Sequence, residues 1–318
     1  MNQEARPVPV DLQQFRVEHY DACSVCLRNF VEHETINLGY LGDGSPASTC
    51  ESCSHVLSDS VAKMVFFRRP YVVPNEAVRL WRYLDFTKYV SMLATQSLYF
   101  ARADQFEDPY EGAKGLRNAK SRWDEHYLRF FRTALGSHPN GVESKLTDDE
   151  IDAEAQRLLS DLELGGEHGR RQTFINCWHE NERESEAMWR LYSTYLPNAL
   201  AVRTSYGRLY RSLGRNPAIS IGRVEYLDFE SQYAGPNDAF WRKRKSFEHE
   251  REVRAMTVDY GVDRKGLHLP CDLTVLIESV VLSPTAAPWF AHVVTDVSSK
   301  YGVSVSISHS NLNDPVFF

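Results

Sequence analysis

The chain has 318 residues, of which 42% are hydrophobic, 12% aromatic and 25% charged. These values are typical of a globular protein with one large domain, or with a medium domain and a small one. The net charge of −7 excludes a sequence-wide electrostatic attraction to nucleic acid or anionic lipid, so any such contact would be local. No signal-peptide pattern and no membrane-spanning apolar run is present. We therefore expect a soluble cytoplasmic protein with no membrane partner.

Residues 1–20 are polar and without pattern, which predicts a loosely held leader. The next segment, 21–62, contains two Cys-x₂-Cys pairs, and its four cysteines are Cys23, Cys26, Cys50 and Cys53. Without a secretion signal, this doubled spacing indicates a structural zinc site of four thiolates rather than disulfides. Such a metal would hold together a module that is too small to fold on a core of its own. After the second pair, residues 54–60 are expected to form a short helix.

The remaining residues, 63–318, are expected to form one α+β domain. Strands are predicted at 78–84, 97–101, 172–178, 199–202, 218–226, 252–258, 273–282 and 303–308. Helices are predicted at 87–94, 114–135, 148–163, 184–195, 205–213 and 288–300. The third of these opens with a capping box, Thr147-x-x-Glu150. Because strands and helices mix without regular βαβ repetition, we expect mixed, mostly antiparallel sheets with helical insertions.

The segment 240–256 begins with basic and aromatic residues and ends in Glu250-x-Glu252-x-Arg254. We expect a helix up to about Phe247 and a strand after it. An extended backbone would place Glu248 and the three charged residues of the motif on one face. Such a face either lies against water or lines a cleft where its charge is used. The alternative is a helix end in which Glu250 and Arg254 form an ordinary i,i+4 pair.

Two further groups of residues are candidates for a site. Asp108 and Glu111 lie in a turn-rich acidic loop, where Asp108 ahead of Pro109 can bond backbone amides or supply a cleft carboxylate. Trp178 and Tyr192 fit the core, with Met188 and Trp189, and both would also suit a cleft rim that stacks on a ring. Cys177 and His179 share a strand face, but no third group orients them as a nucleophile and base.

Five motifs in this order resemble a widespread bacterial domain family whose activity is undefined. They are Leu80-Trp-Arg-Tyr83, Phe106-x-Asp-Pro-x-Glu-Gly112, Cys177-Trp178, Met188-Trp-x-x-Tyr192 and Lys245-x-Phe-x-x-Glu-x-Glu-x-Arg254. The resemblance covers about 80–310 and leaves the cysteine-rich module outside it.

The layout is also similar to that of the ADP-ribosyltransferases, in which the opening strand carries an Arg or His followed by a Tyr, a helix and a strand come next, and a carboxylate strand comes late. This resemblance implies that Arg82 binds NAD, that Tyr83 stacks on it, and that Glu250 or Glu252 is the catalytic carboxylate. Glu252 is preferred because it lies nearer the expected strand. Arg254 would keep the carboxylates ionised or bind a phosphate. The chain departs from the family in having Arg82 where related sequences often carry His, and in lacking a Ser-Thr-Ser motif.

Three hypotheses follow. The favoured one is an NAD-consuming enzyme that transfers ADP-ribose to a nucleic acid or a protein, as in a bacterial toxin or phage-defence effector; its cleft would hold Arg82, Tyr83 and a glutamate. The second is a metal-dependent nuclease or hydrolase, in which Asp108, Glu111, Glu250 and Glu252 converge on a cation beside Lys245. The third is a non-enzymatic, zinc-anchored binding module, in which Glu250 and Arg254 pair with each other or with Lys245 and no pocket adjoins them. The sequence leaves the oligomeric state open.

Overall fold

The computed structural model describes most of the chain beyond residue 70 and parts of the segment before it. The described residues are 9–11, 22–23, 26, 28–31, 35–40, 46–53, 65–66, 71–136, 146–193, 197–216, 218–235, 238–261 and 264–317. The expected helix at 54–60 and most of the leader fall outside these ranges. No helix within them is both long and apolar enough to span a bilayer.

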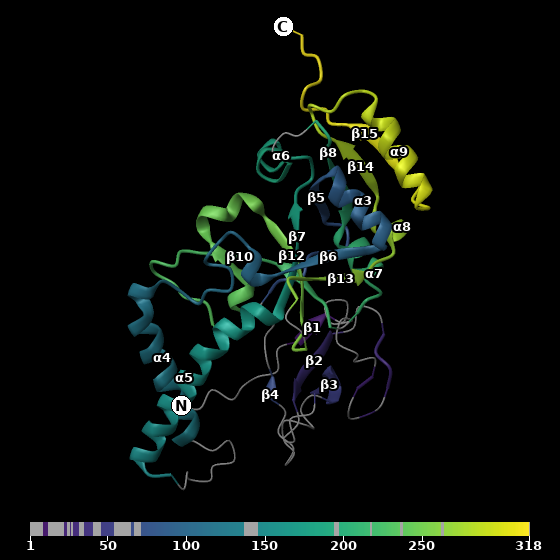
Figure 1. The fold of residues 1–318 in the computed structure, drawn as a ribbon. Helices are drawn as coiled ribbons and strands as arrows, with labels where there is room; N and C mark the ends of the chain where they lie inside the picture. Colours follow the sequence, from purple (N-terminus) through teal and green to yellow (C-terminus); the bar gives the residue numbers. More distant parts are fainter. Residues whose placement is uncertain are drawn as a thin grey trace.

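The N-terminal segment contains a small antiparallel sheet (Figure 1). Its strands are β1 (Pro9–Asp11), β2 (Thr35–Tyr40), β3 (Pro46–Cys50) and β4 (Val65–Phe66), with β1, β3 and β4 all pairing with β2. A short 3₁₀ turn, Glu51–Cys53, follows β3 directly.

The main domain is built on a nine-stranded sheet. The strands are β5 (Arg79–Asp85), β6 (Ser97–Arg102), β7 (Thr173–Glu180), β8 (Ala199–Ser205), β9 (Ser220–Arg223), β12 (Glu252–Val258), β13 (Gly266–Pro270), β14 (Ser279–Leu282) and β15 (Ser306–His309). Their order is β13-β6-β7-β5-β8-β14-β15, and β12 pairs with both β7 and β9. Every pairing in this sheet is antiparallel except β14 with β15. The expected mixed α+β fold with a mostly antiparallel sheet is therefore confirmed.

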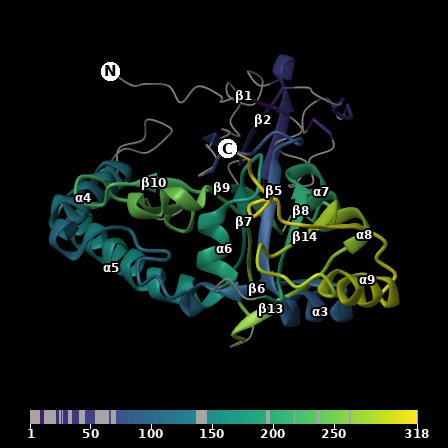
Figure 2. The same ribbon diagram turned by 90° about the horizontal axis from the view of Figure 1, so that it is seen from above.

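Helices cover the sheet on two sides. They are α3 (Phe86–Thr95), α4 (Lys120–Gly136), α5 (Asp148–Gln172), α6 (Glu186–Ser193), α7 (Tyr206–Ser212), α8 (Leu273–Leu276) and α9 (Phe290–Lys300). Both views place α4 and α5 together on one side of the sheet, away from α3, α8 and α9 (Figures 1 and 2). The Thr147–Glu150 capping box forms as expected, and α5 continues nine residues beyond the predicted end at 163.

Several predicted elements differ in type. The basic half of 240–256 forms no α-helix but two 3₁₀ turns, Ala239–Trp241 and Lys245–Glu250, on either side of the short strand β11 (Arg242–Arg244). β11 pairs with β10 (Glu225–Leu227), so the strand expected at 218–226 is divided between β9 and β10. Residues 273–276 are helical because Asp272 caps them, with its carboxylate accepting from two backbone amides. The edge strand β13 was not predicted.

The sheet divides in two along one edge of β7. The other edge of β7 pairs along its whole length with β12, from Glu252↔His179 to Val258↔Thr173. On the divided edge, β5 pairs with β7 only at Leu80↔Glu180 and Trp81↔His179, and β6 only at Ala101↔Ile175 and Arg102↔Phe174. Residues 176–178 of β7 therefore have no strand partner on that side. β5 and β6 diverge there, joined beyond the fork by α3.

Candidate active site

A cavity of about 270 Å³ lies at this fork. Its wall includes residues 81–84 of β5, Tyr99 and Ala101 of β6, and Ile175 and 177–179 of β7. The third side is formed by Lys243, Glu250 and Glu252. The fork cavity, as we call it, therefore lies where side chains from three separate parts of the chain meet. Its volume is slightly below the ~300–1,000 Å³ of typical ligand sites. The cavity could therefore hold one part of a large ligand.

Arg82 is the most unusual group in the fork cavity. Its guanidinium lies over the ring of Trp178, 5.7 Å from the ring centroid, and it makes no hydrogen bond or salt bridge with any other described residue. Burial lowers its pKa from 12.5 to about 10. A buried cation without a partner is costly, so such a group is normally kept for a ligand that neutralises it.

Tyr83 lies beside Arg82 but is tied into the core. Its hydroxyl accepts a hydrogen bond from the backbone N–H of Ser185 (2.8 Å), and its ring meets Trp189 edge-on at 4.9 Å. Burial raises the pKa of Tyr83, so the hydroxyl stays protonated. One side of this ring lines the fork cavity, while the rest positions α6 against β5.

Glu252 is held by two cations. Arg254, which is fully buried, donates to Glu252 from Nε (2.7 Å) and Nη2 (3.2 Å), and Lys243 lies 3.1 Å from its Oε2. Burial alone would raise the pKa of Glu252, but the charges of Arg254 and Lys243 outweigh it and hold the pKa well below 4.5. Arg254 also grips the buried carboxylate of Glu111 with both terminal nitrogens, so it is a structural clamp behind the cavity.

Glu250 is bound more lightly. The Tyr192 hydroxyl donates to Oε1 (2.8 Å), and Lys243 forms an ion pair with Oε2. Within the described part of the chain, one cation therefore contacts Glu250, and each of its oxygens receives one donor. Both glutamates are at least 94% buried, and both line the cavity. The predicted common face is confirmed for Glu252 and Arg254 but not for Glu250, because Arg251 between them adopts φ 40° and breaks the alternation.

His179 lines the fork cavity and has an unused hydrogen-bond acceptor. Its Nδ1 lies 2.6 Å from the carbonyl oxygen of Glu250, to which it donates, which leaves Nε2 buried and without a partner. Burial lowers the pKa of His179, so the imidazole is neutral near pH 7. The neighbouring Cys177 has a pKa raised well above 9.0 by burial and by Glu252. A protonated thiol is a weak nucleophile, so the geometry gives no support to a Cys177–His179 pair.

The acidic loop holds segment 240–254 in place. Asp108 accepts from Arg244 (2.9 Å), whose guanidinium stacks on Tyr110 at 4.1 Å, and Glu111 binds Arg254. Gly112 then adopts φ +71°, and a Cβ there would lie 2.4 Å from the ring of Phe240. Neither Asp108 nor Glu111 lines the fork cavity. Their position indicates that they support segment 240–254 from behind.

Of the residues predicted from sequence for catalysis or cofactor binding, the cavity collects six. They are Arg82, Tyr83, Trp178, Tyr192, Glu250 and Glu252. Trp178, Met188 and Trp189 are buried as expected, whereas Tyr192 is 48% exposed at the rim. The sequence pointed to Lys243 only as part of the basic run 242–245, which is typical of a solvated surface and is also the best local candidate for phosphate contact. The informative signal was position: Lys243 is the middle residue of β11, and alternation turns it inward.

The four cysteines of the N-terminal segment converge as predicted. Their sulfur atoms all lie within 4.8 Å of one another, and they are the only group of three or more potential metal ligands among the described His, Cys, Asp and Glu residues. The backbone N–H of Cys50 points to the sulfur of Cys23 at 3.5 Å, the kind of contact that stabilises a thiolate. Four sulfur atoms at this spacing can coordinate one metal ion tetrahedrally, with metal–sulfur bonds of about 2.3 Å.

No family model matches the chain, and no curated protein matches it. Three solved structures of DarT from Thermus sp. 2.9 are similar to it at a TM-score of 0.32 each. The complex with carba-NAD⁺ has 9% identity and covers 74% of this chain and 97% of that one. The complexes with ADP-ribosylated single-stranded DNA and with NAD⁺ have 10% and 8% identity and cover 74% and 75% of this chain. A TM-score this low does not establish a shared fold.

Proposed function

We propose that this chain is an NAD-consuming ADP-ribosyltransferase that works in the fork cavity. The observation that carries the proposal is the charge arrangement around Arg82. An unpartnered guanidinium and two carboxylates line one cavity, so a suitable ligand has a negative group for Arg82 and a positive one for the glutamates. NAD meets both requirements, since it joins a pyrophosphate to a cationic nicotinamide ring.

The chemistry would proceed by loss of nicotinamide. The bond between the nicotinamide nitrogen and the ribose C1′ breaks, its electron pair leaves with nicotinamide, and positive charge develops on the ribose. A fixed carboxylate in a water-poor cavity stabilises that charge. A nucleophilic atom of the acceptor then forms the new bond to C1′ and gives up its proton.

Glu250 suits the electrostatic role better than Glu252. Glu252 is already neutralised by Arg254 and Lys243, and its Oε2 receives a donor from each. Glu250 shares only Lys243 and keeps a free lone pair on each oxygen. This assignment departs from the preference for Glu252 drawn from sequence. Glu252 is then the residue that positions Lys243.

The acceptor proton requires a base within the cavity. His179 lines the cavity, and its neutral Nε2 has no hydrogen-bond partner among the described residues, so this residue is the candidate. A nucleic acid or a protein would supply the nucleophile, and a toxin or phage-defence role would fit such an activity.

The test is NAD turnover by the purified full chain, followed as nicotinamide release. We expect Glu250→Gln to bind NAD but to release nicotinamide at least ~100-fold more slowly, as for other lost electrostatic groups. Glu248→Gln is the matched control, because it removes an exposed carboxylate from the same segment. If the wild-type chain neither binds NAD nor turns it over with nucleic-acid and protein acceptors, the proposal fails.

The metal-dependent alternative has less support. Among the described residues, Asp108, Glu111, Glu250 and Glu252 form no group with metal-ligand spacing. Three of these carboxylates are instead bound to Arg254 or Lys243. Cations already occupy the places that a divalent ion would take.

We further propose that Cys23, Cys26, Cys50 and Cys53 hold a structural zinc ion. With one ion per chain, metal analysis of the purified protein is expected to give a 1:1 ratio, and Cys26→Ser to reduce it. Zinc that is absent from wild-type protein purified with zinc in the medium would contradict the assignment.

A further inference from the structure

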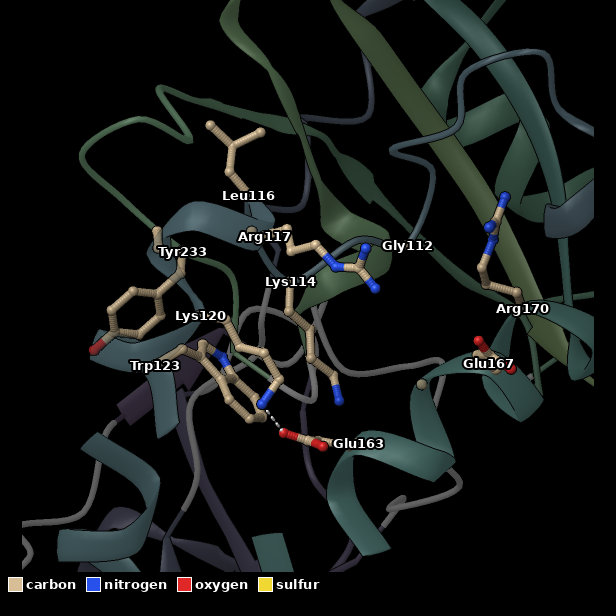
Figure 3. A pocket seen from close by; sticks show the side chains of 13 residues that line it. Gly112, Lys114, Leu116, Arg117, Lys120, Trp123, Glu163, Glu167, Arg170 and Tyr233 are labelled. Atoms are coloured by element: carbon tan, nitrogen blue, oxygen red, sulfur yellow. Dashed lines mark ion pairs between the residues drawn. The ribbon is translucent and has the colours of Figure 1, made fainter. Parts of the chain in front are cut away.

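A second cavity, of about 350 Å³, lies between the acidic loop and the helical arm formed by α4 and α5 (Figure 3). Four cationic side chains line it: Lys114, Arg117, Lys120 and Arg170. Against them stand only two carboxylates, Glu163 and Glu167. The wall therefore carries an excess of positive charge in a chain whose net charge is −7.

Two of the four cations are already engaged. Lys120 forms ion pairs with Asp124 (2.7 Å) and Glu163, and Lys114 donates to the carbonyl oxygen of Leu162 (2.6 Å). Burial lowers the pKa of Lys114, which lies over the ring of Trp123 at 5.1 Å. These contacts hold the Lys114 and Lys120 side chains in place on the cavity wall.

The other two cations make no contact of this kind, although the charge of Arg170 helps to lower the pKa of the nearby Asp104. Neither Arg117 nor Arg170 makes a hydrogen bond or salt bridge within the described part of the chain, and the Nε of Arg170 is buried without a partner. Figure 3 shows the Arg117 guanidinium above Lys114, and Arg170 on the other side of the pocket, above Glu167, with its guanidinium turned away from that carboxylate. Two unpaired guanidinium groups on one cavity are suited to the oxygens of a phosphate.

The other residues that line the cavity indicate which class of ligand it could bind. Leu116, Trp123 and Tyr233 give an apolar side, which suits a ligand that carries an apolar body beside its anionic group. Glu163 and Glu167 accept hydrogen bonds, so hydroxyl or amino donors on the ligand would be satisfied there. A phosphate, a flat or apolar body and hydroxyl donors occur together in a nucleotide.

We propose that this second cavity binds a nucleotide unit, with its phosphate on Arg117 and Arg170. The unit comes either as a free mononucleotide or as part of a nucleic-acid strand. The cavity is separate from the fork cavity. The 108–112 loop adjoins both: Gly112 lines the second cavity, and its neighbour Glu111 binds Arg254 behind the fork cavity.

The experiment is calorimetric titration of the full chain, without NAD, using AMP and a 5′-phosphorylated single-stranded oligonucleotide as probes. We expect one or both to bind, and Arg117→Gln and Arg170→Gln each to weaken binding at least 10-fold. Arg129→Gln is the matched control, because Arg129 is an exposed residue of α4 paired with Glu125 and absent from the cavity. AMP binding of the same strength as oligonucleotide binding identifies a mononucleotide site, and much tighter oligonucleotide binding identifies a strand site.

Binding of neither probe by the wild-type chain would overturn the proposal, as would binding that both arginine variants leave unchanged. A thermal melt of each variant checks that it folds; Arg117 is exposed, so its replacement is not expected to alter the fold. Arg117 and Arg170 line the second cavity but not the fork cavity, so probe binding in the fork cavity would be unchanged in both variants, and the two sites are distinguished.

Discussion

Replacing Arg82 by Met should stabilise the protein while it abolishes NAD binding. The guanidinium is partly buried, with its Nη1 shielded from solvent, and it has no hydrogen-bond or salt-bridge partner among the described residues; burial lowers its pKa from 12.5 to about 10. At about 1.4 kcal/mol per pKa unit, that shift corresponds to a destabilisation of at most ~3 kcal/mol. Because Arg82 keeps some contact with solvent, which screens its charge, we expect a gain of about 1–2 kcal/mol. Met retains the apolar stem that packs on Trp178.

Urea denaturation followed by tryptophan fluorescence measures this gain. All six tryptophans lie beyond residue 80, so the signal reports the main domain and not the cysteine-rich module. NAD binding is measured on the same samples by calorimetry. Arg79→Met is the control on the same strand: Arg79 is paired with Glu182, so its loss should bring no gain.

Two results would refute this reasoning. If Arg82→Met lowers the free energy of unfolding, then Arg82 has stabilising partners and is not held ready for a ligand. If the variant binds NAD as tightly as the wild type, then Arg82 is no part of an NAD site.

Three further predictions concern the buried charges and the acidic loop. Glu252→Gln should cost about 3–5 kcal/mol of stability, because Arg254 and Lys243 lose a shared anion, whereas Glu250→Gln should cost less; equal losses in urea denaturation would contradict this. Since the pKa of Glu252 is lowered on folding, its stabilisation is complete above about pH 4.5 and should be lost as the pH falls below that value; a Glu252→Gln variant should show a correspondingly weaker acid dependence in thermal melts. Gly112→Ala should lower the free energy of unfolding by ~1–3 kcal/mol, because residue 112 has φ +71° and the added Cβ would lie 2.4 Å from the Phe240 ring. An unchanged melting temperature would show that the loop adapts to the alanine.

The local features of the chain could be predicted from its sequence. The capping box of α5, the strand at 252–258 and the convergence of four cysteines each depend on residues whose spacing is itself the signal. The predicted secondary structure failed where tertiary contacts override local preference. In segment 240–250, a basic stretch with helical character is pulled into β11 by pairing with β10, and Arg251 enters the left-handed region to turn the chain back to β7.

The sequence by itself determined which residues carry charge and chemistry, and it named most of those that line the fork cavity. It could not determine their partners. Arg82 and Arg254 look alike in sequence, each within a strand beside aromatic or acidic residues. Only the tertiary structure leaves Arg82 unpaired at the fork and clamps Arg254 between Glu111 and Glu252, residues 141 positions apart. The reason is physical: a buried charge acts according to what neutralises it, and that partner comes from elsewhere in the chain.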